Sequence, residues 1–263
     1  MFQGAQEIMD LASSSIKQGF EKYRDYDFLI CGHSLGGGTA VIVTLAFLYD
    51  SSVSSLLPAG TEIQCVALAP PPVYRWNDGH NRCNWSIYQN MFIFEKITIS
   101  HSTSFFFKIR LIQNIDIFIN NDDIIPRISL ASIVKMFKML RAIDSLDLSN
   151  YEVFQLIFQT TYTEDTSSNM EKVRNAIDNI QLEDIHLLHH PGRIHYFHRK
   201  KIDESLEYFI SEQQSFSFSN DILILDQMVF DHTQPYYEEA FAKCQLNDVE
   251  DDDGDECKVA QEI

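Results

Sequence analysis

One short turn constrains this chain more than any other feature: residues 32–36 read G-H-S-L-G and lie between two segments of opposite character. Before it, residues 28–31 form the run FLIC, which lacks polar alternation and is typical of a strand buried on both faces of a parallel sheet. After it, residues 36–49 read GGGTAVIVTLAFLY, which favours a helix packed closely on that sheet. The pattern predicts a sharp strand-to-helix turn with Ser34 at its tip.

The rest of the chain continues the alternation of helix and strand. Apolar residues recur at helical spacing over 8–23, and 63–69 reads as a second buried strand that ends at a triple proline. Residues 115–119 (IDIFI) predict another strand, 129–180 look mostly helical, and 190–198 resemble a strand introduced by a turn. This order predicts an α/β fold in which helices flank a mostly parallel sheet.

Composition bounds the class of partner. The formal net charge is -18, which argues against nucleic acid, because binding phosphate backbones requires a basic face. Contact with anionic lipid would therefore depend on apolar insertion. Seven acids lie between residues 248 and 256, so we expect a disordered acidic tail over 246–263. The remainder, 1–245, is predicted to be one domain with insertions near 76–112 and 129–185.

The five cysteines do not suggest a disulfide framework or a zinc pattern, since Cys31 and Cys65 lie inside apolar runs. The first ten residues lack the basic and apolar regions of a signal peptide, and no apolar stretch is long enough for a membrane span. We therefore expect a cytoplasmic protein that contacts membranes peripherally.

The turn has the chemistry of a nucleophile elbow. Its geometry forces Ser34 into a strained backbone conformation at the carboxyl edge of the sheet, and glycines at 32 and 36 would remove Cβ atoms that clash there. The N–H of Leu35, at the start of the helix, is the expected first donor to an oxyanion. The plainer interpretation is a glycine-rich turn that contains a serine by chance.

A serine nucleophile needs a histidine base and a carboxylate that orients it. Asp123 follows the strand at 115–119 and precedes the turn IIPR, a position from which its carboxylate would reach the same sheet edge. Asp122 competes for this role. Either residue could instead be a solvated turn aspartate.

The base is chosen from nine histidines. His232 follows the apolar run DILIL and precedes the helix-like YYEEAFA, which is where such a fold places its base. His33 is expected to shape the elbow. Five other histidines lie close together in the sequence without metal-ligand spacing, so we expect no metal site there. We expect these five to be ordinary exposed strand and turn residues: His186, His189, His190, His195 and His198.

Together these residues resemble the class 3 (fungal lipase-like) family, and within it the sn-1-specific diacylglycerol lipases. The resemblance rests on five islands: CGHSLGGGTA at 31–40, ALAPPPVY at 67–74, NNDDIIPRISL at 120–130, HPGRI at 190–194 and DHTQPYY at 231–237. It implies an α/β-hydrolase fold, hydrolysis of acyl esters of glycerolipids without a cofactor, and a triad of Ser34, Asp123 and His232. The aspartate before IIPR carries the match, which ranks Asp123 above Asp122.

The sequence also departs from the family. Members carry strands before the elbow and a loop that supplies a second oxyanion donor, whereas about thirty residues precede Ser34 here. We therefore expect an N-terminally truncated domain, with that donor unassigned. Two alternatives stay open: a catalytically weak lipid-binding or scaffold protein with an incomplete oxyanion hole, and an esterase or acyltransferase acting on a non-lipid ester.

Overall fold

The structure is a computed structural model that describes residues 1–74, 113–153, 164–180, 188–202, 205–214, 222 and 225–244. Helices and strands follow one another in this order: α1 (Phe2–Lys22), β1 (Phe28–His33), α2 (Leu35–Tyr49), α3 (Ser51–Ser54), β2 (Ile63–Leu68), β3 (Ile115–Asn120), the short 3-10 helix η1 (Ile125–Arg127), α5 (Leu130–Asp144), α7 (Glu164–Asp178), β4 (Arg193–Ile202), β5 (Ser205–Gln214) and α8 (Gln234–Lys243).

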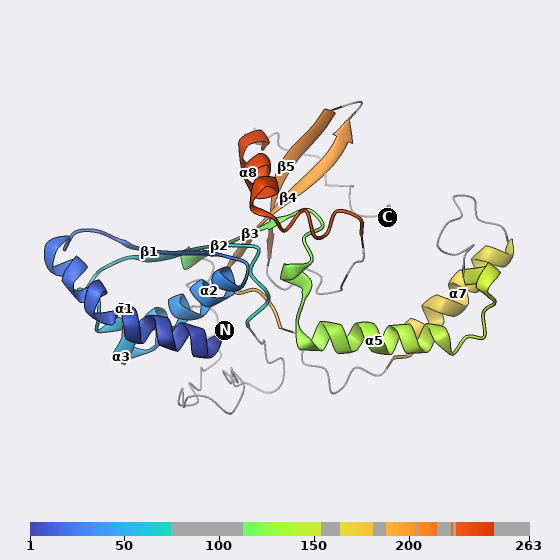
Figure 1. The fold of residues 1–263 in the computed structure, drawn as a ribbon, viewed down its shortest axis with the longest axis horizontal. Coiled ribbons are helices and arrows are strands. Elements are labelled where there is room, and N and C mark those ends of the chain that lie inside the picture. Colours follow the sequence, from blue (N-terminus) through green and yellow to red (C-terminus); the bar gives the residue numbers. More distant parts are fainter. Residues whose placement is uncertain are drawn as a thin grey trace, which may run out of the picture.

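The strands form one five-stranded sheet in the order β1-β2-β3-β4-β5. β1 to β4 run parallel to one another, and only β5 is antiparallel to its neighbour β4. The predicted mostly parallel sheet is thus confirmed. Helices α1, α2 and α3 lie on one side of the sheet and α8 on the other, while α5 and α7 project from the sheet as an arm (Figure 1).

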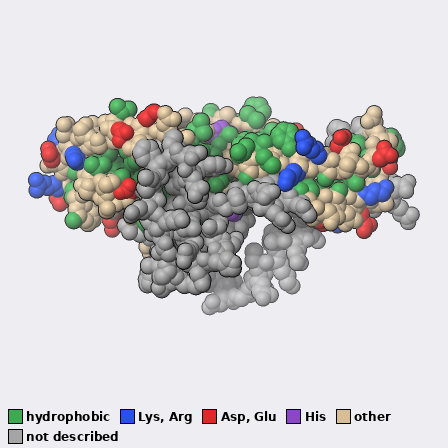
Figure 2. Space-filling view, turned by 90° about the horizontal axis from the view of Figure 1, so that it is seen from below, with side chains coloured by type: hydrophobic (Ala, Val, Ile, Leu, Met, Phe, Trp, Pro, Cys, Tyr) green, Lys and Arg blue, Asp and Glu red, His purple; other side chains and the backbone are tan. Residues whose placement is uncertain are grey.

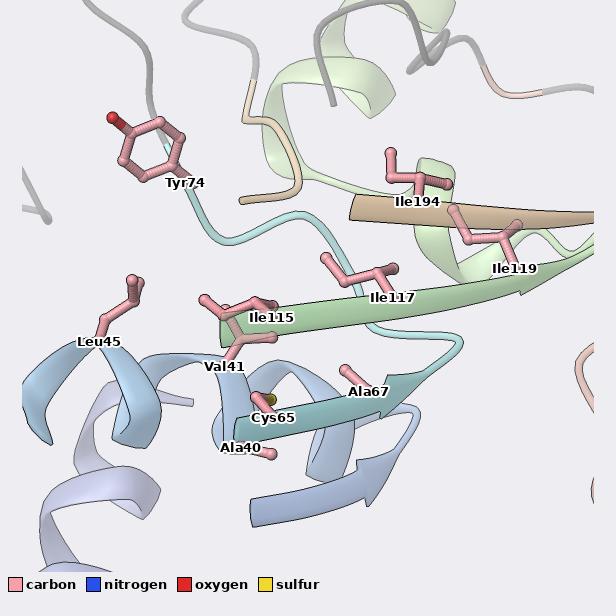
Figure 3. Packing of buried hydrophobic residues seen from close by; sticks show 10 residues of the cluster. All are labelled: Ala40, Val41, Leu45, Cys65, Ala67, Tyr74, Ile115, Ile117, Ile119 and Ile194. Atoms are coloured by element: carbon pink, nitrogen blue, oxygen red, sulfur yellow. The ribbon is translucent and has the colours of Figure 1, made fainter. Parts of the chain in front are cut away.

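The main core lies between α2 and the sheet. Alternate residues of β2 and β3 point toward α2 and are fully buried, among them Cys65, Ile115 and Ile117. The small and branched side chains of α2 allow the helix to approach the strands, and Figure 3 shows Ala40 and Val41 facing β2 and β3. This close packing fixes the end of β1 relative to the start of α2, which is where Ser34 lies.

β1 corrects one sequence prediction. Its residues alternate between partly buried and exposed, and Leu29 is 58% exposed, so the strand is not buried on both faces. Two features of the topology explain the difference. β1 is an edge strand, and α8 covers the second face of the sheet only farther along, where Phe241 contacts Phe118 of β3 and Phe197 of β4. An apolar run without alternation therefore did not indicate two-sided burial.

The remaining predictions of secondary structure can be compared where residues are described. α1 starts six residues earlier than its predicted bound, and α5 and α7 confirm the helical character of 129–180. A capping box made by Ser129 and Ser132 begins α5. The predicted insertion at 76–112 and the tail at 246–263 lie outside the described residues. In the parts of the chain that the structure describes, no helix combines the length and apolarity needed to cross a membrane.

Candidate active site

Ser34 lies in the strained turn that the sequence predicts. Its backbone has φ 57° and ψ -128°, a region that L-residues rarely adopt, and it joins β1 directly to α2. The N–H of Ser34 donates to the carbonyl of Leu68 at the end of β2 (2.9 Å), and its own carbonyl accepts from the N–H of Gly38 (3.0 Å). Backbone bonds on both sides therefore hold the serine in place.

Of the two glycines expected to avoid a Cβ clash at the turn, one does so and the other does not. A Cβ on Gly32 would lie 2.3 Å from the carbonyl oxygen of Gly36, so glycine is required there. A Cβ on Gly36, by contrast, would meet nothing within 4 Å. The second position that has no room for a Cβ is Gly37, where the added atom would lie 2.9 Å from the Leu68 carbonyl oxygen. The prediction that Gly36 avoids a clash was wrong in its mechanism: Gly36 supplies the backbone that Gly32 must approach.

Three side chains from distant parts of the sequence form one hydrogen-bonded chain. Nε2 of His232 lies 2.9 Å from Oγ of Ser34, and Nδ1 lies 3.1 and 3.2 Å from the two carboxylate oxygens of Asp123. Asp123 is completely buried, whereas 21% of the His232 side chain is exposed. With the Nδ1 proton on the carboxylate side, Nε2 is free to accept the proton of Ser34.

The carboxylate of Asp123 is held by two further donors. The N–H of Ile125 donates to Oδ1 (2.9 Å), and the buried hydroxyl of Tyr237 donates to Oδ2 (2.9 Å). The same hydroxyl accepts from the N–H of Asn120 (3.0 Å), so both its roles are used. Burial raises the pKa of Tyr237 well above its ordinary value, and the Asp123 charge acts in the same direction, which keeps the phenol protonated as a donor.

Asp122, the competing aspartate, lies elsewhere in the turn. Its Oδ2 accepts from the side-chain amide of Asn121 (3.0 Å), and its N–H donates to the carboxylate of Asp231 (3.2 Å). Asn121 has a positive φ of 42° in the turn between β3 and Asp123. The two neighbouring aspartates therefore serve different purposes: Asp123 faces His232, and Asp122 belongs to the turn.

Asp231, next to His232, is held both by β4 and by the loop that carries Asp123. Arg199 of β4 binds Asp231 through two hydrogen bonds, 2.6 and 3.2 Å long, and the Asp231 side chain is completely buried. Asp231 also accepts from the amide of Asn121 (3.1 Å). Burial raises the pKa of Asp231, while the bonds from Asn121 and Arg199 oppose the change. Because Asp231 precedes His232, this cluster fixes where the imidazole enters the site.

His33 contacts the base directly. Its ring stacks on the ring of His232, with centroids 4.8 Å apart and planes inclined by 26°, and its Nε2–H donates to the backbone carbonyl of His232 (3.0 Å). The expected role in shaping the elbow therefore includes holding the partner loop.

The remaining described histidines have partners of their own. His190 is buried and donates from Nε2 to the carbonyl of Pro126 (2.8 Å), and burial lowers its pKa to about 4. It is thus not an exposed turn residue as predicted. His195 and His198 bind Asp116 and Ser211 respectively, both at 2.7 Å. Across the described residues no cluster of His, Cys, Asp or Glu has the arrangement of a metal site.

Sequence reasoning missed the residues that support this arrangement. Hydrogen bonds that hold Asp123 and the loop of His232 come from Tyr237, Arg199 and Asp231, and no residue spacing in the sequence reveals these partners. Tyr237 and Asp231 do lie inside the DHTQPYY island. That island was the one available signal.

Comparison with known proteins identifies the family. A model of the class 3 lipases, described as Lipase (class 3), matches residues 1–133, and no curated protein matches. Among solved structures, the lipase of Rhizopus microsporus var. chinensis is 13% identical with a TM-score of 0.33, over 50% of this chain and 36% of that one. The Rhizomucor miehei lipase propeptide complex is 18% identical with a TM-score of 0.30, over 50% and 33%.

The chain thus spans about a third of the length of these lipase structures, and the assignment of family rests on the family model, which covers half of the chain. Its mostly parallel sheet with flanking helices is that of an α/β-hydrolase fold. The chain belongs to the class 3 lipase family.

Proposed function

We propose that the protein is a serine lipase or esterase that hydrolyses acyl esters of glycerolipids, with diacylglycerol as its preferred class of substrate. The observation that supports the reaction best is the hydrogen-bonded chain Ser34–His232–Asp123, in which the base lies 2.9 Å from the serine oxygen. Membership of the class 3 lipases and the strained backbone of Ser34 support the same reaction. The preference for diacylglycerol is supported by the resemblance of the five sequence islands to the sn-1-specific diacylglycerol lipases.

The first half of the reaction forms an acyl-enzyme. Nε2 of His232 takes the hydroxyl proton as Oγ of Ser34 attacks the ester carbonyl carbon. The resulting oxyanion accepts a hydrogen bond from the N–H of Leu35, which belongs to the first turn of α2 and therefore has no acceptor within the helix. Buried Asp123 stabilises the imidazolium. His232 then protonates the glycerol oxygen as the carbon–oxygen bond breaks.

The second half regenerates the serine. Water loses a proton to His232 and attacks the acyl carbonyl, and the same histidine returns the proton to Oγ of Ser34 as the fatty acid leaves. No step in this sequence calls for a metal or an organic cofactor. The substrate is a glycerolipid presented at a membrane, and the strongly acidic chain makes nucleic acid an unsuitable partner.

Labelling with a fluorophosphonate tests the activated serine. We expect stoichiometric modification of Ser34 in the wild-type protein and none in Ser34→Ala, with near-complete loss of p-nitrophenyl butyrate hydrolysis in the same variant. Circular dichroism establishes that both samples are folded. A folded wild-type protein that neither labels nor hydrolyses the ester would refute the proposal and favour the lipid-binding or scaffold alternative.

The substrate class needs its own measurement. Fatty acid release from diacylglycerol, triacylglycerol and a water-soluble ester is compared at equal enzyme concentration. We expect the highest kcat/KM with diacylglycerol. Faster turnover of the soluble ester than of either glycerolipid would instead identify an esterase for non-lipid substrates.

A further inference from the structure

Two of the five sequence islands contribute no residue to the proposed chemistry: ALAPPPVY at 67–74 and HPGRI at 190–194. In the structure the end of the first lies beside the start of the second. Tyr74 and His189 form an isolated antiparallel bridge, in which the N–H of Tyr74 donates to the carbonyl of His189 (2.9 Å). Figure 3 shows the segment that carries Tyr74 running beside the segment that leads into β4. The bridge therefore fixes the chain where the HPGRI island begins.

The turn that follows this bridge is constrained as well. Gly192 has a φ of 100°, and a Cβ there would lie 2.3 Å from the carbonyl oxygen of Ile115 at the start of β3. Glycine is required at this position, because both the left-handed backbone and the close approach exclude a side chain. The backbone that carries His190 is thus held from both sides.

His190 lies buried against the loop that carries Asp123. The residue is 1% exposed, and its Nε2–H donates to the carbonyl of Pro126 (2.8 Å). On the face seen in Figure 2, histidine contributes only small areas of surface among hydrophobic side chains. Burial lowers the pKa of His190 to about 4, which keeps the imidazole neutral at ordinary pH. Because a carbonyl only accepts, the single ring proton is on Nε2.

The carbonyl that His190 binds belongs to the turn that holds the candidate acid. Pro126 is buried in η1, which has only three residues, so most of its backbone groups have no partner within the helix. The preceding residue, Ile125, donates its N–H to Oδ1 of Asp123 (2.9 Å). His190 therefore satisfies a buried carbonyl and at the same time fixes the turn whose N–H binds the carboxylate.

The same stretch of chain also holds the loop on the other side of Asp123. The N–H of Asn121 donates to the carbonyl of Phe197 in β4 (2.8 Å), and the hydroxyl of Tyr196 donates to the carbonyl of Asn121. The loop is thus bound two residues before Asp123 by β4 and three residues after it by His190. Contacts on both sides restrict where the carboxylate can lie.

We propose that His190 is a positioning residue for Asp123: its bond to the Pro126 carbonyl holds η1 so that the carboxylate meets Nδ1 of His232. His190 acts through the loop and does not touch the reacting atoms. A misplacement of about 1 Å in a catalytic group can cost about 10²-fold in rate, so losing one anchor should lower kcat by about tenfold. This inference rests on the proposed function, because the position of Asp123 affects the rate only if His232 is the base.

Two amide substitutions separate the hydrogen-bond donor from the side chain. The amide nitrogen of glutamine lies where Nε2 lies and that of asparagine where Nδ1 lies, so only His190→Gln can keep the bond to Pro126. With p-nitrophenyl butyrate, we expect His190→Asn to have an about tenfold lower kcat and an unchanged KM, and His190→Gln to have a kcat within about threefold of wild type. His190→Phe, which has a ring but no donor, should behave like His190→Asn without leaving empty space.

Two further variants serve as controls. His198 also lies on β4, but it binds Ser211 of β5 (2.7 Å), so His198→Asn should change neither kcat nor KM. Val43→Ala opens space in the core around α2 and should lower the melting temperature at an unchanged kcat. This second control shows whether lost stability by itself lowers kcat.

Proton NMR reads the acid–base pair directly. The proton between Nδ1 of His232 and Asp123 resonates far downfield when the two groups are close, so His190→Asn should shift this signal and His190→Gln should not. Equal kcat in these two variants, or a loss of kcat no greater than that of Val43→Ala, would overturn the positioning role. Failure of both donor-free variants to fold would overturn it too, since a positioning residue leaves the fold intact.

Fluorophosphonate labelling separates this inference from the proposed function. Labelling of Ser34 depends on the same base, so we expect His190→Asn to react about tenfold more slowly than wild type. Equal labelling rates in the two folded proteins would remove the role of His190 and leave the proposed reaction intact. A folded wild-type protein that does not label would remove the proposed function itself.

Discussion

Among the described residues, two histidine–aspartate pairs can be compared, and the histidine of one of them is hydrogen-bonded to a serine. His232 and Asp123 are 3.1 Å apart, and His195 and Asp116 are 2.7 Å apart, so the second pair is the shorter. Both imidazoles also stack on a ring, His232 on His33 and His195 on Phe118. Proximity of an imidazole to a carboxylate therefore does not distinguish a candidate catalytic pair from a structural one.

The surroundings of the two pairs do differ. Asp123 is completely buried and receives hydrogen bonds from neutral donors, whereas Asp116 is 25% exposed and is bound by Arg193 at 2.8 and 3.1 Å. The arginine satisfies the charge of Asp116. The carboxylate of Asp123 receives neutral N–H and O–H donors and faces the imidazole, so its charge favours a proton on His232 when Ser34 gives one up. The two pairs therefore differ in the third group that binds them: the hydroxyl of Ser34 contacts His232 at one pair, and the guanidinium of Arg193 contacts Asp116 at the other.

The largest difference between the pairs is expected from Asp→Asn substitution. Asp123→Asn should lower kcat by about 10⁴-fold, because the amide no longer fixes the tautomer of His232 or stabilises its cation. Asp116→Asn is the control and should leave kcat within about twofold, since a partly exposed ion pair contributes little beyond stability. Both variants are measured on p-nitrophenyl butyrate. Equal losses of kcat would erase the distinction drawn between the pairs.

Tyr237→Phe tests whether the neutral donor positions Asp123. The change removes the O–H bond to the carboxylate and leaves the N–H of Asn120 without its acceptor, so we expect about 1–3 kcal/mol lower stability and about a tenfold lower kcat. Thermal unfolding and steady-state kinetics give the two quantities. Tyr236→Phe, at the adjacent position, should change neither. A Tyr237→Phe protein with lower stability but unchanged kcat would show that the phenol has a structural role only.

His33→Phe separates stacking from hydrogen bonding at the base. The new ring can still stack on His232, but it cannot donate to the backbone carbonyl of that residue. Loss of one neutral hydrogen bond corresponds to about 0.5–1.5 kcal/mol, so kcat/KM should fall by about twofold to twelvefold. Phe118→Leu, which removes the ring stacked on His195, should leave kcat/KM unchanged.

The smallest effect concerns the pH dependence of stability at Asp116. Burial alone would raise the pKa of Asp116, but the hydrogen bonds from Arg193 and His195 outweigh it and lower the pKa. The stability that this carboxylate contributes is therefore complete above its unfolded pKa of about 3.9 and is lost as pH falls through the lower folded value. Denaturant unfolding should show Asp116→Asn to be about 1 kcal/mol less stable than wild type near neutral pH. The two curves should converge in strong acid, and a constant offset down to low pH would contradict this.

Local features were predictable because they follow from neighbouring residues. An apolar run predicts the strand before Ser34, and a run of small and apolar residues predicts the helix after it. Gly32, where a Cβ would clash, allows the turn between them, and all three features lie within about twenty positions. Asp123 was preferred over Asp122 because it directly precedes IIPR in the sequence island at 120–130. The structure places Asp123 next to His232, while Asp122 stays in the turn.

Features that depend on distant neighbours were not predictable in the same way. The exposed face of β1 follows from its position at the sheet edge, which no local pattern reveals. Burial of His190 and the opposite roles of Gly36 and Gly37 likewise depend on which backbone lies across from them. The contribution of Tyr237 depends on α8 lying over the end of β3.

By itself, the sequence determined an α/β chain with a strained serine between a strand and a helix, since those preferences act over a few residues and need no distant contact. The sequence islands also single out Asp123 and His232, but only the tertiary structure decides whether the three side chains meet, because His232 lies 198 positions from Ser34 and 109 from Asp123. Hydrogen bonds form over about 3 Å, so separations of this size are closed only when sheet order and helix packing bring the loops to one edge.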